Sequence, residues 1–215
     1  MRIRITFTKQ GALRYTGHLD LHKLWERAAR RAGLPLAYSR GFHPQPKMNM
    51  AAALPLGFSS RCEVMDVKLE SEIPLEGLRE RLNQTLPSGV RVLQVEQVDE
   101  RAPALQTQVV SAEYEVALAD SSTSIRVDGS DLKRRIASVM DAESIIRSRR
   151  GKQYDLRPLI ESLASISSPE GRGEKILMKL SAKEGATGRP EEVLDVLGIA
   201  FEGTRVERVR LNFQS

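Results

Sequence analysis

The order of alternating and helical hydrophobic patterns is the feature that most constrains the fold of this chain. In the first hundred residues, apolar side chains alternate along Arg2–Thr8 and follow helical spacing along Leu19–Ala32 and Leu75–Leu86. Alternation predicts half-buried strands, and three- to four-residue spacing predicts amphipathic helices. Three further segments are predicted strands: Lys47–Ala53, Glu63–Leu69 and Val90–Val98. The resulting order, βαββαβ, is that of the ferredoxin-like unit.

A similar order recurs in the second half, after a predicted hinge at Asp99–Gln108. The predicted strands are Ser111–Ala119, Ser144–Arg150, Lys175–Ala182 and Arg205–Phe213, and the predicted helices are Ser130–Met140 and Pro190–Leu197. The two halves share no residue-level similarity, so this repeat rests on the order of elements alone. We therefore predict an α+β fold of two tandem ferredoxin-like domains, with a basic N-terminal domain at 1–100 and a C-terminal domain at 109–215.

Positive charge is concentrated near the N-terminus. Residues 1–60 contain ten lysine and arginine side chains and only two acidic residues, Asp20 and Glu26, which gives this segment a formal charge of +8. The rest of the chain has a formal charge of −3, within a total of +5. A basic segment on a nearly neutral body indicates a localised anion-binding surface.

The predicted helix at 19–32 places its cations on one side. Its inner face carries Leu21, Leu24, Ala28 and Ala32, and its outer face carries Lys23, Arg27, Arg30 and Arg31. Like charges four residues apart destabilise a helix by about 0.2–0.5 kcal/mol per pair. Only Glu26, four residues before Arg30, relieves this repulsion. An anion partner is therefore the favoured interpretation, and an ordinary solvated helix face is the alternative.

A proline-rich loop follows this helix. Gly41 can adopt a positive φ, and Pro44 and Pro46 stiffen the exit from the turn. Aromatic and basic side chains are interleaved along the loop: Tyr38, Arg40, Phe42, His43 and Lys47. This mixture suits single-stranded nucleic acid, because a stacked base contributes about 1–3 kcal/mol and each cation adds a salt-sensitive phosphate contact. The alternative is that the two aromatic residues fill the core.

All three histidines lie in the same region. His18 and His22 are four residues apart and Glu26 continues the row, so these three side chains could hold zinc or iron. Ordinary helix-surface histidines are the alternative, and we expect no metal or other cofactor. His18 or His43 could instead act as a general acid or base on an RNA 2′-hydroxyl.

The second half contains one basic cluster, within Arg147–Lys152. The favoured interpretation is a charged hairpin. The alternative is an extension of the basic surface, if both halves face one groove.

The single cysteine, Cys62, limits both the compartment and the chemistry. It excludes an internal disulfide and fits a reducing environment. No apolar run approaches the roughly 20 residues of a membrane-spanning helix, and the start of the chain alternates like a strand rather than a signal peptide. We therefore expect a cytoplasmic protein with no membrane partner.

Four stretches resemble the radical SAM-linked protein family: Thr16–Leu21, Glu26–Pro46, Leu54–Gly57 and, more distantly, Lys152–Pro158. Positions that match its motifs include His18, Asp20, Glu26, Arg27, Arg30, Arg31, Gly41, Phe42, Pro44 and Pro46. His22 lies outside the pattern. Members of that family occur beside, or fused to, a radical SAM enzyme, so the resemblance implies such an enzyme as partner. Its association with genes of RNA processing and the ribosome implies an RNA substrate.

A radical SAM cluster needs a set of cysteine ligands that one cysteine cannot provide, so any radical chemistry would belong to the partner. We expect an RNA-binding accessory protein, rather than an enzyme, that presents a tRNA- or rRNA-like substrate to the radical SAM enzyme. One alternative is a metal-independent endoribonuclease that uses a histidine of the N-terminal domain. The other is a protein adaptor that docks on a radical SAM partner without RNA.

Overall fold

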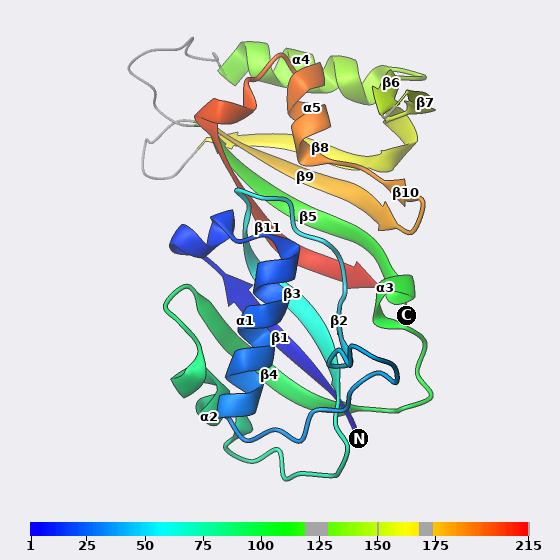
Figure 1. Cartoon of the computed structure of the whole chain (residues 1–215). Helices are drawn as coiled ribbons and strands as arrows, with labels where there is room; N and C mark the ends of the chain where they lie inside the picture. The colour runs from blue at the N-terminus through cyan, green and yellow to red at the C-terminus, as the bar shows by residue number, and fades with distance from the viewer. Residues whose placement is uncertain (119–128, 150, 168–173, 215) are drawn as a thin grey trace. The chain divides into compact units, whose positions relative to one another are not determined.

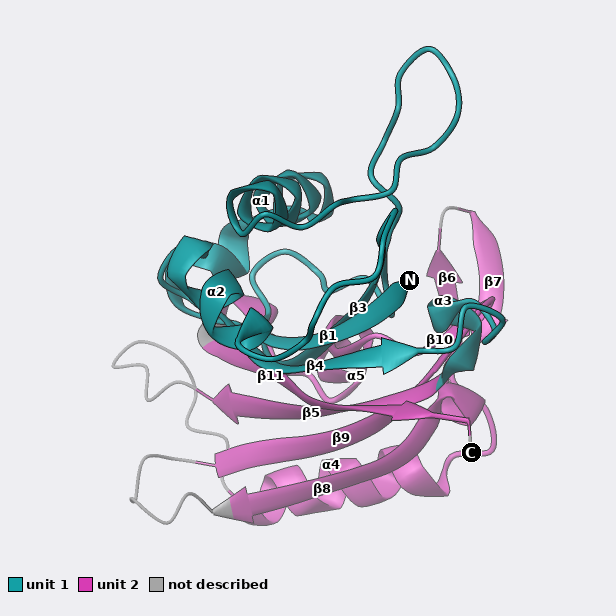
Figure 2. Cartoon of the chain, turned by 90° about the horizontal axis from the view of Figure 1, so that it is seen from below, with its two compact units in different colours: residues 1–109 teal, residues 110–215 magenta. Residues whose placement is uncertain are grey.

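The chain divides into two compact units, unit 1 at Met1–Val109 and unit 2 at Val110–Ser215 (Figure 2). The computed structural model describes residues 1–118, 129–149, 151–167 and 174–214. These residues include five α-helices together with the strands of both units, which confirms the predicted α+β class. No helix in the described part of the chain is long and apolar enough to span a membrane.

Unit 1 is built from an antiparallel sheet and the helices that pack on it (Figure 1). Its elements are β1 (Arg2–Lys9), the 3-10 helix η1 (Gly11–Tyr15), α1 (His18–Arg31), β2 (Met48–Met50), β3 (Ser59–Lys68), α2 (Leu78–Thr85), β4 (Val90–Val98) and α3 (Leu105–Gln108). The strands lie in the order β4-β1-β3-β2, and each neighbouring pair is antiparallel. Figures 1 and 2 show α1 and α2 on the same face of this sheet.

Helix α1 is amphipathic, and its apolar side faces the sheet. Its buried residues are Leu21, Trp25, Ala28 and Ala29. The ring of Trp25 packs edge-on against Phe7 of β1, with ring centroids 4.7 Å apart and planes inclined by 66°. Such a pair contributes about 0.5–1.5 kcal/mol beyond simple burial. Gly33, at a φ of 72°, follows the helix in the left-handed conformation that glycine favours, in agreement with the predicted stop.

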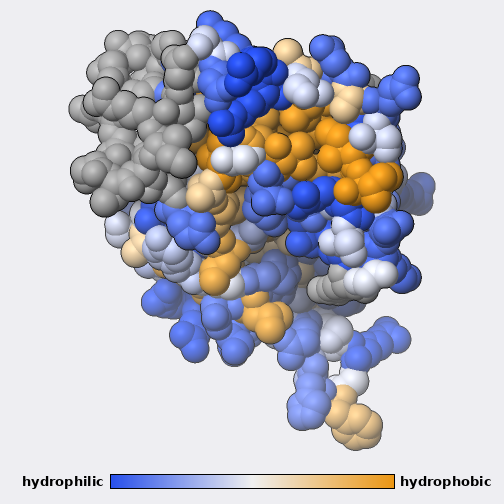
Figure 3. Space-filling view, turned by 90° about the horizontal axis from the view of Figure 1, so that it is seen from above, coloured by the Kyte–Doolittle hydropathy of each residue, from blue (hydrophilic) through white to orange (hydrophobic). Residues whose placement is uncertain are grey.

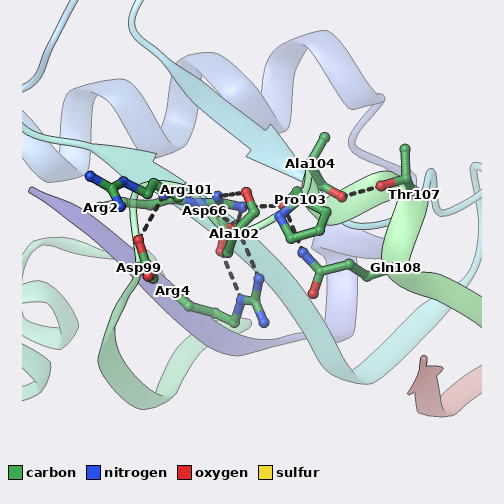
Figure 4. A network of polar contacts seen from close by, with 10 residues as sticks. All are labelled: Arg2, Arg4, Asp66, Asp99, Arg101, Ala102, Pro103, Ala104, Thr107 and Gln108. Atoms are coloured by element: carbon green, nitrogen blue, oxygen red, sulfur yellow. Dashed lines mark hydrogen bonds and ion pairs between the residues drawn. The ribbon is translucent and has the colours of Figure 1, made fainter. Parts of the chain in front are cut away.

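Arg2 and Arg4 of β1 share one buried carboxylate on β3 (Figure 4). Arg2 Nε donates to Oδ2 of Asp66 at 3.0 Å, and Arg4 Nε donates to Oδ1 at 2.8 Å. Arg2 also donates to the carbonyl oxygens of Ala102, at 2.7 Å, and Pro103, at 3.0 Å. These bonds tie the segment after β4 to the sheet of unit 1.

Unit 2 contains its own strands and helices. They are β5 (Val109–Leu118), α4 (Gly129–Asp141), β6 (Ile146–Arg149), β7 (Lys152–Asp155), η2 (Arg157–Leu159), β8 (Ile160–Ser167), β9 (Glu174–Lys183), β10 (Ala186–Thr187), α5 (Pro190–Val196), η3 (Phe201–Gly203) and β11 (Thr204–Phe213). The main strands lie in the order β8-β9-β5-β11, and β10 also pairs with β9. Strands β6 and β7 form a separate hairpin.

One strand of the second half was not predicted. The segment Ser144–Arg150, whose last residue lies outside the described residues, is a strand as predicted over most of its described part, where it forms β6 and pairs with β7. The strand that was not predicted is β8, which pairs with β9. The register of this pair shifts between Ile160 and Ser162, which interrupts the apolar alternation, so the sequence pattern does not reveal the strand.

Candidate nucleic-acid interface

The outer side of α1 carries the four predicted cations. All of them are exposed: Lys23, Arg27, Arg30 and Arg31. Because the opposite side of the helix is buried in the core of unit 1, these side chains share the face that points away from the sheet. The cations extend from Lys23 to Arg31, and a rise of about 1.5 Å per residue separates the first and last of them by roughly 12 Å along the helix axis.

Two of these cations have partners within the described part of the chain. Arg30 lies 3.6 Å from the carboxylate of Glu26, and Arg31 Nη2 donates to the carbonyl oxygen of Thr85 in α2 at 2.7 Å. Within the described residues, Lys23 and Arg27 have neither a hydrogen-bond nor an ion-pair partner. The Arg30–Glu26 pair is exposed, so it contributes little to stability. The face therefore keeps most of its positive charge.

The segment after α1 forms a narrow projection, residues 39–45, which we call the finger. Its two arms are joined by a bond from Ser39 N to Gln45 O at 2.8 Å and one from Gln45 N to Ser39 Oγ at 2.9 Å. Below the finger, Lys47 N donates to Ala37 O at 2.8 Å, and both arms bond to Lys68 of β3. The finger is thus a hydrogen-bonded hairpin whose base is bonded to β3 of the sheet.

The finger presents one aromatic residue to solvent. The exposed fraction of Phe42 is 101%, and Arg40, His43 and Lys47 are exposed as well. Tyr38, in contrast, is half-buried and packs against the core of unit 1. Of the two aromatic residues that the sequence offered for base stacking, Phe42 is therefore the accessible one.

The finger and α1 lie on the same side of unit 1. Figure 2 shows the helix above one face of the β4-β1-β3 sheet and the finger extending away from that same face. Figure 3 shows the projection from another direction, with hydrophilic residues along it and an apolar side chain at its end. The cationic face of α1 and the finger can therefore meet one ligand.

Three of the N-terminal cations do not contribute to this surface. Arg2 and Arg4 are paired with Asp66. Lys9 is 1% exposed, and its ammonium group donates to Thr16 O at 2.9 Å. The segment charge of +8 thus overstates the charge available to a ligand, because part of it is used inside the fold.

The two neighbouring histidines have different surroundings. His22 Nε2 lies 2.8 Å from the carbonyl oxygen of Met48, whereas His18 is exposed. Their ring centroids are 6.3 Å apart. Across the described residues, no three His, Cys, Asp or Glu side chains are grouped as metal ligands, so His18, His22 and Glu26 do not form the metal site that the sequence spacing allows.

The arrangement needed for acid–base cleavage of RNA is not assembled in the described residues. His18 and His43 are exposed, and neither ring has a hydrogen-bond or ion-pair partner there. A general base is normally oriented by a second group that fixes its tautomer and position. Within the described residues, neither His18 nor His43 is oriented by such a group.

Two cations of the basic hairpin of unit 2 are paired with acidic residues of α5, and Arg150 lies outside the described residues. Arg149 Nη2 lies 2.8 Å from Oε2 of Glu192, and Arg147 forms an ion pair with Asp195. The guanidinium of Arg149 also stacks on Tyr154, 5.0 Å from the ring centroid. Burial and the neighbouring Glu192 raise the pKa of Tyr154 above its usual 10. These contacts support the charged-hairpin interpretation of the segment.

Two exposed apolar residues lie near the start of α1: Tyr15, which precedes the helix, and Leu19, in its first turn. The exposed fractions of Tyr15 and Leu19 are 61% and 75%. Tyr15 stacks against Arg14, whose guanidinium carbon lies 4.7 Å from the ring centroid. Helical spacing could have predicted the exposure of Leu19, because this residue lies outside the buried stripe that contains Leu21 and Trp25.

Comparison with known proteins identifies the family of this chain. None of the curated proteins matches this chain. A family model described as "Uncharacterized protein conserved in bacteria (DUF2344)" matches residues 2–190, which include unit 1 from Arg2 onward and most of unit 2. The cationic helix and the finger both lie inside the match. The chain therefore belongs to this DUF2344 family of uncharacterized proteins conserved in bacteria.

Proposed function

We propose that this protein is an RNA-binding accessory protein that presents a tRNA- or rRNA-like substrate to a radical SAM enzyme. The observation that carries the proposal is the exposed cationic face of α1, on which Lys23 and Arg27 have no partner within the described residues. A polyanion is the ligand that such a face attracts most strongly.

Repulsion between like charges destabilises α1, and an anionic ligand would offset this repulsion. Lys23 and Arg27 are four residues apart, as are Arg27 and Arg31, and each like-charged pair destabilises a helix by about 0.2–0.5 kcal/mol. An RNA backbone supplies a regular series of phosphates, and their binding releases counterions. Nucleic acid therefore explains a row of exposed cations better than a single small anion does.

The length of the face also favours a polymer. A stacked nucleotide advances about 3.4 Å along a strand, so the roughly 12 Å from Lys23 to Arg31 corresponds to about three to four nucleotides. Arg40 on the finger and Lys47 below it are also exposed cations of unit 1. We propose that they extend the phosphate contacts beyond the helix.

The strand orders support a fold of two tandem ferredoxin-like domains. The sheet order is β4-β1-β3-β2 in unit 1 and β11-β5-β9-β8 in unit 2. In each unit these four strands and two helices follow one another along the chain as strand, helix, strand, strand, helix, strand. The β6–β7 hairpin is then an insertion after the first helix of the second domain.

The radical SAM partner rests on the resemblance of the motif stretches around His18, Arg27 and Phe42. Cys62 is the single cysteine of the chain, so a cluster that needs several cysteine ligands would have to be held by another protein. In this proposal the chain binds the RNA, and the partner carries out the reaction.

Fluorescence anisotropy with a labelled structured RNA tests the proposal. We expect binding by the wild type and a loss of at least roughly tenfold in affinity in the triple variant Arg27→Ala, Arg30→Ala, Arg31→Ala. The matched control is Arg79→Ala, Arg81→Ala, Arg91→Ala, which removes the same charge from exposed positions of unit 1 outside α1. Equal losses in both triple variants would show a general charge effect and would count against the proposal.

The same samples separate the alternatives. Cleavage of the RNA that is lost in His18→Ala or His43→Ala would favour an endoribonuclease. A complex with a radical SAM enzyme that survives nuclease treatment, together with no RNA binding by the purified chain, would favour the protein adaptor.

A further inference from the structure

The finger carries one large apolar side chain, Phe42, that is not packed in the core of unit 1. Burial of a phenylalanine in a core is favourable, yet Phe42 is 101% exposed while Phe7 and Phe58 of the same unit are buried. The residues on either side do not shield it, since Arg40, Gly41, His43 and Pro44 are all exposed. A ligand that contacts Phe42 therefore meets the whole ring.

The finger is also preorganised. The two bonds between Ser39 and Gln45 join its arms, and Pro44 restricts the backbone next to the tip. Tyr38, at the base, packs on the core of unit 1. Because these contacts already order the finger, binding of a ligand to Phe42 would cost little conformational entropy of the finger.

The reach of the finger limits what Phe42 can touch. Phe42 is four residues beyond Tyr38, and an extended chain advances about 3.3 Å per residue, so the tip can stand up to roughly 13 Å above its base. That reach is enough to pass a phosphate backbone and contact a base. In a continuous RNA duplex, however, the bases are stacked and the major groove is too narrow for side chains.

We propose that Phe42 stacks on an unpaired base of a structured RNA while the neighbouring phosphates lie along α1. The substrate class is thus an RNA with at least one unpaired nucleotide, in a bulge or loop, next to a duplex. Arg40 and His43 flank the ring and face the phosphates on either side of that nucleotide. This inference rests on the proposed RNA-binding function and adds which RNA the site selects.

Two RNA probes test the inference: a continuous duplex, and the same duplex with a single bulged 2-aminopurine, whose fluorescence reports stacking. We expect the full-length wild type to bind the bulged probe at least roughly tenfold more tightly and to change its fluorescence. Phe42→Ala should lose roughly 5- to 100-fold in affinity for the bulged probe, and Phe42→Trp should retain most of it. The loss should be small for the continuous duplex.

Leu19→Ala is the matched control, because Leu19 is another exposed apolar residue of unit 1, and neither variant removes a buried contact. If Phe42→Ala and Leu19→Ala bind the bulged probe equally well, while the Arg27, Arg30, Arg31 triple variant still loses affinity, the stacking inference is wrong and RNA binding stands. If the wild type binds neither probe, both proposals fail. Equal affinity of the wild type for the two probes also overturns the selection of unpaired bases.

Discussion

His22 Nε2 lies 2.8 Å from the carbonyl oxygen of Met48 and so joins α1 to β2. Met48 follows the base of the finger directly, and its own N–H donates to Pro46 O at 2.9 Å. The contact therefore connects the cationic helix to the chain that carries Phe42. His22 therefore has a structural role here.

We expect His22→Ala to lower the free energy of unfolding by about 1 kcal/mol, the typical value of one partly buried hydrogen bond. His18→Ala should change it by less than about 0.5 kcal/mol, because His18 is exposed. Urea denaturation followed by circular dichroism measures both. Equal effects of the two substitutions would contradict the assignment of His22 as the anchoring residue.

Asp66→Ala should be far more destabilising, since the side chains of Arg2 and Asp66 are only 7% and 4% exposed. Removal of the Asp66 carboxylate leaves the buried guanidinium of Arg2 without a counter-ion, and such a loss typically costs about 3–5 kcal/mol of stability. Glu70→Ala, at an exposed position of the same unit, serves as the control. A loss in Asp66→Ala as small as that of the control, measured by denaturant unfolding, would refute this role.

The stability contributed by Asp155 should depend on pH. Its Oδ1 accepts hydrogen bonds from Ile145 N at 2.8 Å and Arg157 N at 2.9 Å, and these bonds hold the pKa of Asp155 below its usual 3.8. A carboxyl group with a depressed folded-state pKa stabilises the fold above its unfolded pKa, and this contribution is lost as the pH falls through the folded value. Asp155→Ala should therefore be less stable than the wild type at pH 7.

The difference between Asp155→Ala and the wild type should narrow as the pH falls below about 4. Thermal unfolding monitored across a pH series checks this expectation. A difference that stays constant from neutral to acidic pH would mean that the charge of Asp155 is not what stabilises the turn between β7 and η2.

Arg149→Ala and Arg27→Ala remove the same charge but should have opposite consequences. Arg149 is held by Glu192 and stacks on Tyr154, so its loss should destabilise the fold and leave RNA affinity within about twofold. Arg27 is exposed, so its loss should reduce RNA affinity and leave stability nearly unchanged. Parallel anisotropy and denaturation of the two variants provide the test, and a reversed outcome would move the interface to unit 2.

Much of the fold was predictable because local patterns match the elements. The alternation along Val90–Val98 gives β4 with the same bounds, and the helical spacing along Leu19–Ala32 gives α1 to within one residue at each end. Strand β2 is shorter than the predicted Lys47–Ala53, and α2 is shorter than the predicted Leu75–Leu86. At these ends, turns and side-chain bonds override the hydrophobic period.

The positions of the charges in the candidate site could be predicted from the sequence, but the contacts that its side chains make within the fold could not. Helical spacing was sufficient to place Lys23 and Arg27 on the outer face of α1. It could not assign Tyr38 to the core and Phe42 to solvent, because that choice depends on the hydrogen bonds that close the finger. Nor could it show that Asp66, more than sixty residues away, neutralises Arg2 and Arg4.

The salt dependence of RNA affinity is the most direct test of the central claim that α1 binds a phosphate backbone. For a single-stranded segment with about four phosphate contacts, the logarithm of affinity should fall against the logarithm of salt concentration with a slope near roughly −3. In the Arg27, Arg30, Arg31 to Ala variant the slope should be smaller in magnitude by about 2. An unchanged slope and affinity in that variant would contradict the account.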